Sequence, residues 1–140
     1  MEILYRVEHG STSVSSQAFV DVLRSSGLAP RRPVDDPECI AGMLTGADLT
    51  VSAWEGDALV GIARTVTDRH YAAYLSDLAV DRKLQRAGVG KELVRRTQAA
   101  LEPTCTLILL AAPQAVDYYP RIGFEHHPEA WILRPGETLA

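Results

Sequence analysis

The 140-residue chain has few cysteines, few aromatic residues and no strong excess of charge of one sign. Its two cysteines, Cys39 and Cys105, form no CxxC pair, which argues against a zinc site and against a disulfide framework. We expect two free, mostly buried thiols in a reducing cytosol. The 14 basic and 18 acidic residues sum to −4, so the chain lacks the basic surplus of a general nucleic-acid binder.

Long hydrophobic runs are also missing. The longest apolar run, residues 107–112, is far shorter than a membrane-spanning helix requires. The first residues show no cationic stretch followed by an apolar one, so we expect no signal peptide, no membrane partner and a cytoplasmic location. An apolar share of 46% and a charged share of 23% are ordinary for a folded protein. The length suits one domain over residues 1–140.

Strand-like and helix-like segments alternate along the chain. Short turns join three consecutive strand-like runs, which predicts an antiparallel meander. The stretch 106–111 is apolar without alternation, as in a strand covered on both faces. The predicted strands are 3–7, 50–54, 58–67, 71–80, 106–111 and a closing stretch from 124 that includes 131–133, and the predicted helices are 13–26, 37–46, 91–101 and 113–122.

This order, β-α-α-β-β-β-α-β-α-β, combines a meander with a crossover through a helix. It predicts an α/β (α+β) domain in which helices flank a mixed, mostly antiparallel sheet in three layers.

The stretch 85–90 (QRAGVG) lies between an apolar strand that ends at Val80 and a helix that begins near Lys91. Glycines at such a junction let a ligand approach the backbone, and the helix start offers unpaired N–H groups. Together they predict an anion site suited to a diphosphate, to which Arg86 and Lys91 add charged contacts. The alternative is that Gly88 and Gly90 serve a tight turn only.

Two other glycine motifs fail on this stretch. A Walker loop requires a glycine four residues before Gly-Lys-Ser/Thr, but positions 85 and 92 are Gln and Glu. A dinucleotide fingerprint requires a third small residue, but position 93 is Leu.

Three stretches carry a resemblance to a known family. Residues 85–90 match a Gln/Arg-x-x-Gly-x-Gly/Ala loop, the strand residues 78–80 precede it, and 119–124 (YPRIGF) match Tyr-x-x-x-Gly-Phe. In these features, most sharply over 74–124, the chain resembles the GCN5-related N-acetyltransferase (GNAT) superfamily. The resemblance implies a GNAT-like fold and acetyl-CoA as cosubstrate, with no metal. The cofactor contacts that it implies are Leu78, Ala79, Val80, Gln85, Arg86, Ala87, Gly88, Val89, Gly90 and Lys91.

The resemblance also implies direct acetyl transfer in a ternary complex. A backbone N–H near Leu78–Val80, freed where the fourth and fifth strands diverge, would polarise the thioester carbonyl. Tyr119 aligns with the tyrosine proposed as acid for the CoA thiolate, and an ordinary pKa of about 10 keeps such a group protonated. A packed aromatic is the alternative for Tyr119. Pro120 is expected to kink or end the helix there.

Asp77, a carboxylate in an apolar strand, is the first candidate for the general base. The alternative is an exposed or paired acid on a strand face, and Tyr74, His70 or a chain of waters are the other candidate bases.

The acceptor is the least specified part of the sequence. Arg31 and Arg32 suit an acidic acceptor and Asp35 and Asp36 a cationic one, although a solvated loop and a helix cap explain them equally. We expect N-acetylation of a primary amine on a small molecule. The alternatives are a protein lysine or N-terminus as acceptor, and a CoA-binding sensor or regulatory module without turnover. A homodimer is compatible with this fold.

Overall fold

A computed structural model of the chain describes residues 2–140. The chain divides into two compact units, Met1–Leu110 and Ala111–Ala140. The first unit contains a five-stranded sheet in the order β1-β2-β3-β4-β5. Its strands and helices are β1 (Leu4–His9), α1 (Ser16–Ser26), α2 (Pro37–Gly46), β2 (Leu49–Glu55), β3 (Ala58–Thr67), β4 (Ala72–Val80), α3 (Val89–Ala99) and β5 (Thr106–Leu109), with the 3₁₀ turns η1 (Ala29–Arg31) and η2 (Arg82–Leu84).

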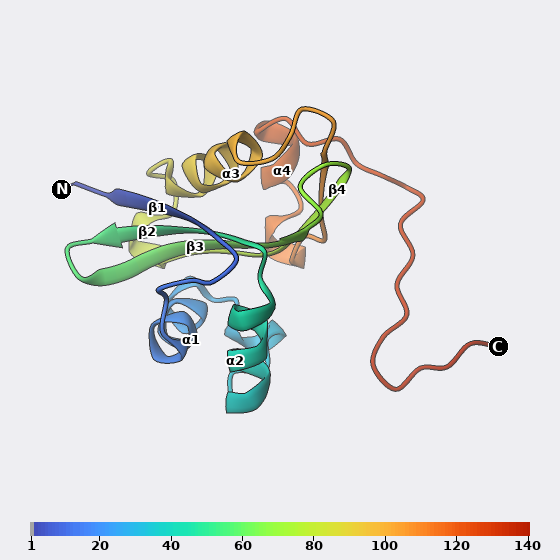
Figure 1. The fold of residues 1–140 in the computed structure, drawn as a ribbon, viewed down its shortest axis with the longest axis horizontal. Coiled ribbons are helices and arrows are strands. Elements are labelled where there is room, and N and C mark those ends of the chain that lie inside the picture. Colours follow the sequence, from blue (N-terminus) through green and yellow to red (C-terminus); the bar gives the residue numbers. More distant parts are fainter. Residues whose placement is uncertain (1) are drawn as a thin grey trace. The chain divides into compact units, whose positions relative to one another are not determined.

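The sheet is mixed, as the sequence predicts. Strands β1 to β4 pair antiparallel, and only β4 and β5 pair in parallel, since the chain crosses over through α3 between them. Helices α1 and α2 cover one face of the sheet and α3 covers the other (Figure 1). The first unit therefore has the predicted three layers.

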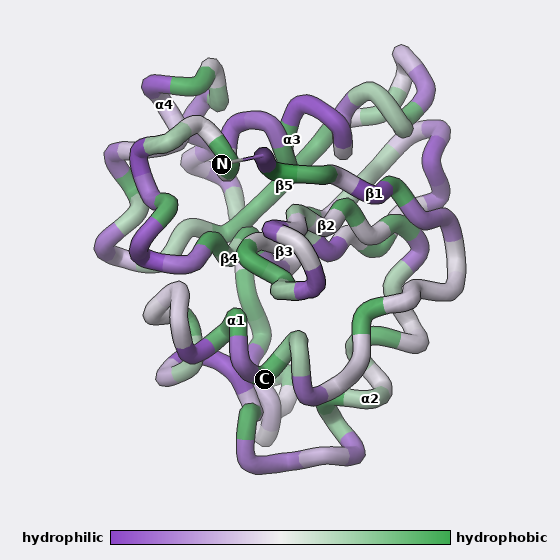
Figure 2. The backbone as a smooth tube through the Cα atoms, turned by 90° about the vertical axis from the view of Figure 1, so that its left-hand side faces the viewer, coloured by the Kyte–Doolittle hydropathy of each residue, from purple (hydrophilic) through white to green (hydrophobic). Residues whose placement is uncertain are grey.

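Each face of the sheet has its own apolar core. Phe19, Leu23 and Ile40 pack with Trp54 and Ile62 under α1 and α2. On the opposite face α3 approaches the sheet so closely that a Cβ at position 61 would lie 3.1 Å from Leu93 Cδ1. The outer face of α3 is charged, and Figure 2 shows this helix as largely hydrophilic.

Local sequence signals explain the helix boundaries on the α1/α2 face. The Ser15 side chain caps α1 by accepting from the Ala18 N–H at 3.1 Å, and Gly27 ends the helix in the left-handed region with φ of 87°. Asp36 caps α2 by accepting from the Cys39 N–H at 3.1 Å, and Pro37 occupies its first turn. Helix α2 therefore has the predicted limits.

The structure differs from the sequence prediction at one edge of the sheet. The side chains of β5 alternate between exposed and half-buried, and Ile108 is 51% exposed, so this strand is not covered on both faces. Hydrophobicity cannot reveal that β5 is the last strand in the sheet order. The prediction of mostly buried thiols was also wrong at Cys39, which is exposed because Ile40 and Leu44 define the buried side of α2.

The second unit also departs from the prediction. In place of one helix over 113–122, it has the 3₁₀ turn η3 (Pro113–Ala115) and the short helix α4 (Tyr118–Arg121). Pro120 lies in the first turn of α4, where a missing N–H costs no helical hydrogen bond, so it does not break the helix. The closing strand from residue 124 is absent: the structure assigns no strand to residues 124–140, and Trp131 is 95% exposed.

Candidate functional site

Strand β4 is irregular at Ser76. Arg64 on β3 lies opposite Asp77, but the next residue, Thr65, lies opposite Leu75. Ser76 is therefore an extra residue in the β3–β4 ladder, which makes it a β-bulge. Such a bulge bends a strand and increases its local twist.

The pairing of β4 with β5 stops at the same place. The parallel register runs from Ala72 opposite Thr106 to Leu75 opposite Leu109 and goes no further. Within the described chain, the β4 segment from Asp77 to Val80 has β3 as its strand partner but not β5. The two strands thus separate beside Leu78–Val80. Apart from Val80 O, which accepts from the Gln85 side chain, backbone groups on this edge of β4 are left for another partner.

The segment after β4 is a tight, well-anchored loop. The Asp81 carboxylate accepts from the Lys83 N–H at 3.0 Å and starts the turn η2. The Gln85 side-chain amide donates to Val80 O at 3.1 Å and to Ser26 O at 3.2 Å. Gln85 therefore ties this loop both to the end of β4 and to the end of α1.

The loop continues through two residues in the left-handed region, Arg86 at φ of 74° and Gly88 at φ of 85°. Gly88 is the N-cap of α3 and supplies no side-chain hydrogen bond to the first turn of that helix. A Cβ added at Gly88 would meet no atom within 4 Å. Arg86, Gly88 and Lys91 are all exposed. The helix start thus presents open backbone N–H groups flanked by two cations, which fits an anionic ligand such as a diphosphate.

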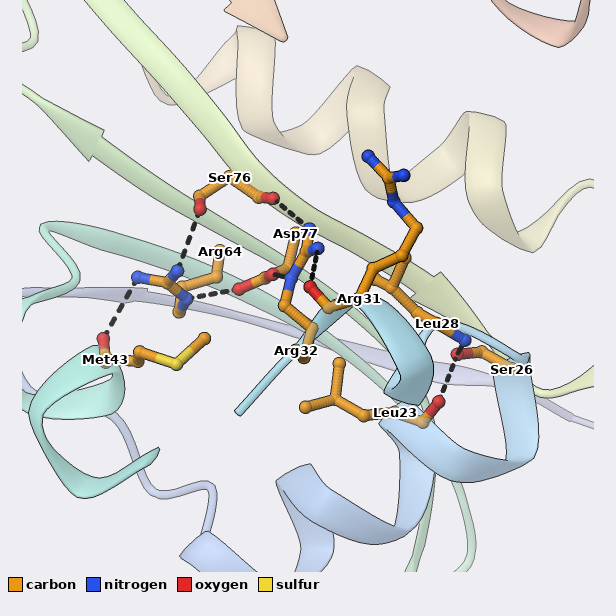
Figure 3. A network of polar contacts seen from close by, with 9 residues as sticks. All are labelled: Leu23, Ser26, Leu28, Arg31, Arg32, Met43, Arg64, Ser76 and Asp77. Atoms are coloured by element: carbon orange, nitrogen blue, oxygen red, sulfur yellow. Dashed lines mark hydrogen bonds and ion pairs between the residues drawn. The ribbon is translucent and has the colours of Figure 1, made fainter. Parts of the chain in front are cut away.

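Asp77 lies at the centre of a buried polar cluster (Figure 3). Its carboxylate has no exposure to solvent. Oδ1 accepts from Arg32 Nε, and Oδ2 accepts from Arg64 Nε at 2.5 Å. The Arg64 side chain is 7% exposed and that of Arg32 is 19% exposed.

The two guanidinium groups have further partners in the same cluster. Arg32 donates to Ser76 O at 2.7 Å, and Arg64 donates to the Ser76 hydroxyl at 2.9 Å. Arg64 also donates to Met43 O in α2 at 3.2 Å. These contacts favour the paired-acid alternative for Asp77, since both of its carboxylate oxygens already accept from guanidinium groups.

Tyr119 lies in the second unit, on α4. Its ring makes edge contacts with Tyr118, at a centroid distance of 5.3 Å, and with Phe124, at 5.5 Å. The Tyr119 carbonyl accepts from the Phe124 N–H at 3.0 Å. Burial raises the pKa of the neighbouring Tyr118 phenol. The Tyr-x-x-x-Gly-Phe stretch is therefore a local aromatic cluster closed by a turn.

The other candidate residues have simpler surroundings. Asp36 caps α2, and Asp35 lies 3.8 Å from Arg24 on the surface. His70 is exposed in the turn before β4, and Tyr74 is exposed within that strand. In residues 2–140, no set of three or more His, Cys, Asp or Glu side chains is placed to bind a metal ion. None of the helices in the same range is both long and apolar enough to span a membrane.

The sequence analysis missed Arg64 and linked Arg32 only to an acceptor. Arg64 interrupts an apolar strand just as Asp77 does, so two opposite charges in neighbouring predicted strands were the available signal. Arg32 lies 45 positions from Asp77 in a proline-rich loop, and no spacing rule relates two such residues.

Comparisons with known proteins agree with this geometry. Residues 26–134 match the family described as the acetyltransferase (GNAT) domain. A GNAT family acetyltransferase from Streptococcus pneumoniae superposes with a TM-score of 0.73 at 22% identity, over 95% of this chain and 99% of that one. An aminoglycoside acetyltransferase from a soil metagenome, solved with sisomicin, gives a TM-score of 0.61 at 20% identity, over 97% of each chain.

Two curated plant proteins match half of the sequence. The chloroplastic GCN5-related N-acetyltransferase 2 of Arabidopsis thaliana is 38% identical over 73 residues, which are 51% of this chain and 28% of the relative. A histone acetyltransferase of Glycine max, TAP1, is 34% identical over 77 residues, or 54% of this chain and 33% of the relative. The chain thus spans about a third of the length of these relatives. The family match covers most of the chain and coincides with the loop, the bulged strand and the aromatic cluster, so the chain belongs to the GNAT acetyltransferase family.

Proposed function

We propose that the protein transfers the acetyl group of acetyl-CoA to a primary amine of a small molecule. The observation that carries this proposal is the open, uncapped start of α3 at Gly88, which the short η2 loop joins to a strand with an unpaired edge. A diphosphate suits the first of these features and an extended amide chain suits the second. CoA contains both groups.

Different residues would bind different parts of the cofactor. Backbone N–H groups of residues 88–91, with the side chains of Arg86 and Lys91, would hold the diphosphate, whereas the N–H groups of Gln85 and Ala87 donate to Arg82 O and Leu84 O within the loop. The free edge of Leu78–Val80 would hydrogen-bond the pantetheine chain and supply a donor to the thioester carbonyl.

The reaction forms the bond from the amine nitrogen to the acetyl carbon and breaks the C–S bond. The amine loses a proton, and the departing thiolate gains one from Tyr119 as the proposed acid.

Asp77 is retained as a site residue, but we propose a different task for it. Because both of its oxygens accept from guanidinium groups, we assign it to holding β4 rather than to taking the amine proton. Tyr74, His70 or a water chain then remain the candidates for the base. The pH dependence of the rate separates the two assignments. If Asp77 is the base, Asp77→Asn lowers the rate mainly at low pH, whereas a structural Asp77 leaves the shape of the profile unchanged.

A small acceptor is favoured by the likeness to the aminoglycoside acetyltransferase, whose structure was solved with an aminoglycoside. A protein lysine or N-terminus is the second candidate, since TAP1 is named a histone acetyltransferase. The net charge of −4 makes an acidic protein tail the less favourable kind of protein partner. A cytoplasmic location remains a prediction from the sequence, based on cysteine usage and on the first residues.

The experiment is a thiol-release assay with acetyl-CoA against a panel of small amines and lysine peptides, run on wild type and Tyr119→Phe. Turnover of small amines that Tyr119→Phe slows while acetyl-CoA binding persists supports the proposal. Turnover of peptides alone selects the protein acceptor. Acetyl-CoA binding without turnover on either panel selects the sensor alternative.

A further inference from the structure

Four segments of the first unit meet at the bulge of β4. Arg32 comes from the loop between η1 and α2, Arg64 from β3, the Met43 carbonyl from α2, and Ser76 and Asp77 from β4 itself. Figure 3 shows the two guanidinium groups on either side of the Asp77 carboxylate, with the neighbouring Arg31 side chain directed away from the cluster. The bulge is therefore bound by side chains from outside its own strand.

Both arginines contact the bulged residue itself. Ser76 is the extra residue of β4; Arg32 donates to its carbonyl oxygen, and Arg64 donates to its hydroxyl. The carboxylate of the next residue, Asp77, joins the two cations. Each guanidinium thus bridges Ser76 and Asp77 with separate N–H groups, a fixed fork geometry that a lysine cannot reproduce.

The stability of the fold does not by itself explain why two arginines and an aspartate are buried together. Burying two cations and one carboxylate carries a desolvation cost, and apolar residues of similar volume often stabilise a fold equally well. Hydrogen bonds with fixed directions instead restrict a backbone segment to one of the several conformations that it could adopt. Here the geometry held is that of the strand segment immediately before Leu78, where the edge facing β5 becomes free.

We propose that Arg32 and Arg64 are positioning residues, which clamp the β4 bulge so that the free edge of Leu78–Val80 is held in the conformation that binds the cofactor. This inference rests on the proposed function, since it assigns that edge to the pantetheine chain. Asp77 is the shared anchor that orients both guanidinium groups.

The position of Arg32 adds a link to the cofactor loop. The segment that carries it starts at Gly27, where a Cβ would lie 2.6 Å from the Arg82 guanidinium of η2. The adjacent Ser26 carbonyl accepts from Gln85. The loop between α1 and α2 is therefore tied to the cofactor loop at one end and to the bulge at the other.

The test compares Arg32→Gln and Arg32→Lys with Arg31→Gln, a matched control on the exposed neighbour. Amide hydrogen exchange of residues 75–80 is measured without ligand, and acetyl-CoA affinity is measured by calorimetry below the melting temperature of every variant. We expect Arg32→Gln to speed exchange in 75–80 by about tenfold while α3 is unaffected. We expect the Kd and KM for acetyl-CoA to rise by about tenfold, with smaller changes in kcat and in the amine KM.

We expect Arg32→Lys to restore part of the slow exchange and of the acetyl-CoA affinity. We expect Arg31→Gln to match wild type in both measurements. The proposal is overturned if folded Arg32→Gln matches Arg31→Gln in exchange and in acetyl-CoA affinity, even where its melting temperature falls. Should Arg32→Gln fail to fold, Arg32→Lys decides by the same two readouts. If wild type itself does not bind acetyl-CoA, the proposed function fails, and the exchange data alone establish or reject the clamp.

Discussion

At the scale of single residues, Asp77 and Arg64 show how a charge is accommodated inside an apolar sheet. Both lie on neighbouring strands within the core. Asp77 accepts from Arg64 and Arg32, and Arg64 also donates to the Ser76 hydroxyl and to Met43 O. In the intact cluster every buried charge has a partner of opposite sign. Removal of Asp77 would leave the two guanidinium groups buried without one.

Asp77→Asn should therefore lower the free energy of unfolding by about 3–5 kcal/mol, because two guanidinium groups lose their carboxylate in a buried position. Urea unfolding at neutral pH measures this change. Asp35→Asn is the matched control, since Asp35 has only a solvent-exposed ion pair at 3.8 Å, and we expect little change there. A loss below about 1 kcal/mol for Asp77→Asn would mean that the cluster is not a coupled ionic unit.

Tyr119→Phe should lower kcat by about 100-fold or more if the phenol protonates the thiolate, because general acids contribute on that order. Acetyl-CoA affinity should stay within about twofold of wild type, since only a hydroxyl is removed. Tyr118→Phe is the matched control on the adjacent ring. Equal kcat values for the two variants would remove Tyr119 from the acid role.

At the scale of elements, α2 depends on its cap. Asp36→Ala should destabilise the protein by about 1 kcal/mol, since the first turn of α2 loses a side-chain acceptor. Thermal or urea unfolding beside Asp35→Ala measures the effect, because Asp35 precedes the cap and makes no such bond. Equal stability of the two variants would contradict the capping assignment.

The turn between β3 and β4 predicts a pH effect. Asp68 Oδ1 accepts from the N–H groups of His70, Tyr71 and Ala72, and these bonds lower the pKa of the carboxyl below its ordinary value of 3.8. A lowered pKa stabilises the fold above the unfolded value, and this contribution disappears as the pH falls through the folded value. The stability gap between wild type and Asp68→Asn should therefore narrow from pH 5 to pH 3 in urea titrations. A stability difference that stays constant over this pH range would show that the charge of Asp68 does not contribute to the stability of the fold.

The sequence predicted several elements whose ends are set by local chemistry. Asp36, Pro37 and Gly46 delimit α2, and the glycine loop before α3 lies where the motif placed it. It did not predict that β5 is an edge strand or that residues 124–140 form no strand, because apolar residues alone do not report which partner a strand has. The loop of the candidate site was predictable for the same local reason, whereas the Arg32 clamp depends on a contact across the fold.

At the scale of the whole molecule, the first unit contains the sheet, the cofactor loop and the clamp, and the second contains the Tyr119 cluster. The proposed cofactor residues lie at the end of β4 and around the start of α3, so under the proposal the binding of acetyl-CoA depends on the first unit most directly. Chemistry on the acceptor requires Tyr119 as well under the proposed assignment. Cofactor binding is thus the claim on which the rest depends.

The most direct test is a thermal-shift titration with acetyl-CoA on wild type, Gly88→Glu and Gly56→Glu. Both variants place a glutamate at a left-handed glycine with no atom within 4 Å of the new Cβ, so they share the strain and the added charge. Ligand at 100 times its Kd stabilises a protein by about 2.7 kcal/mol. We predict a shift of several degrees for wild type and Gly56→Glu and none for Gly88→Glu. Equal shifts in all three proteins, or none in wild type, would contradict the cofactor site.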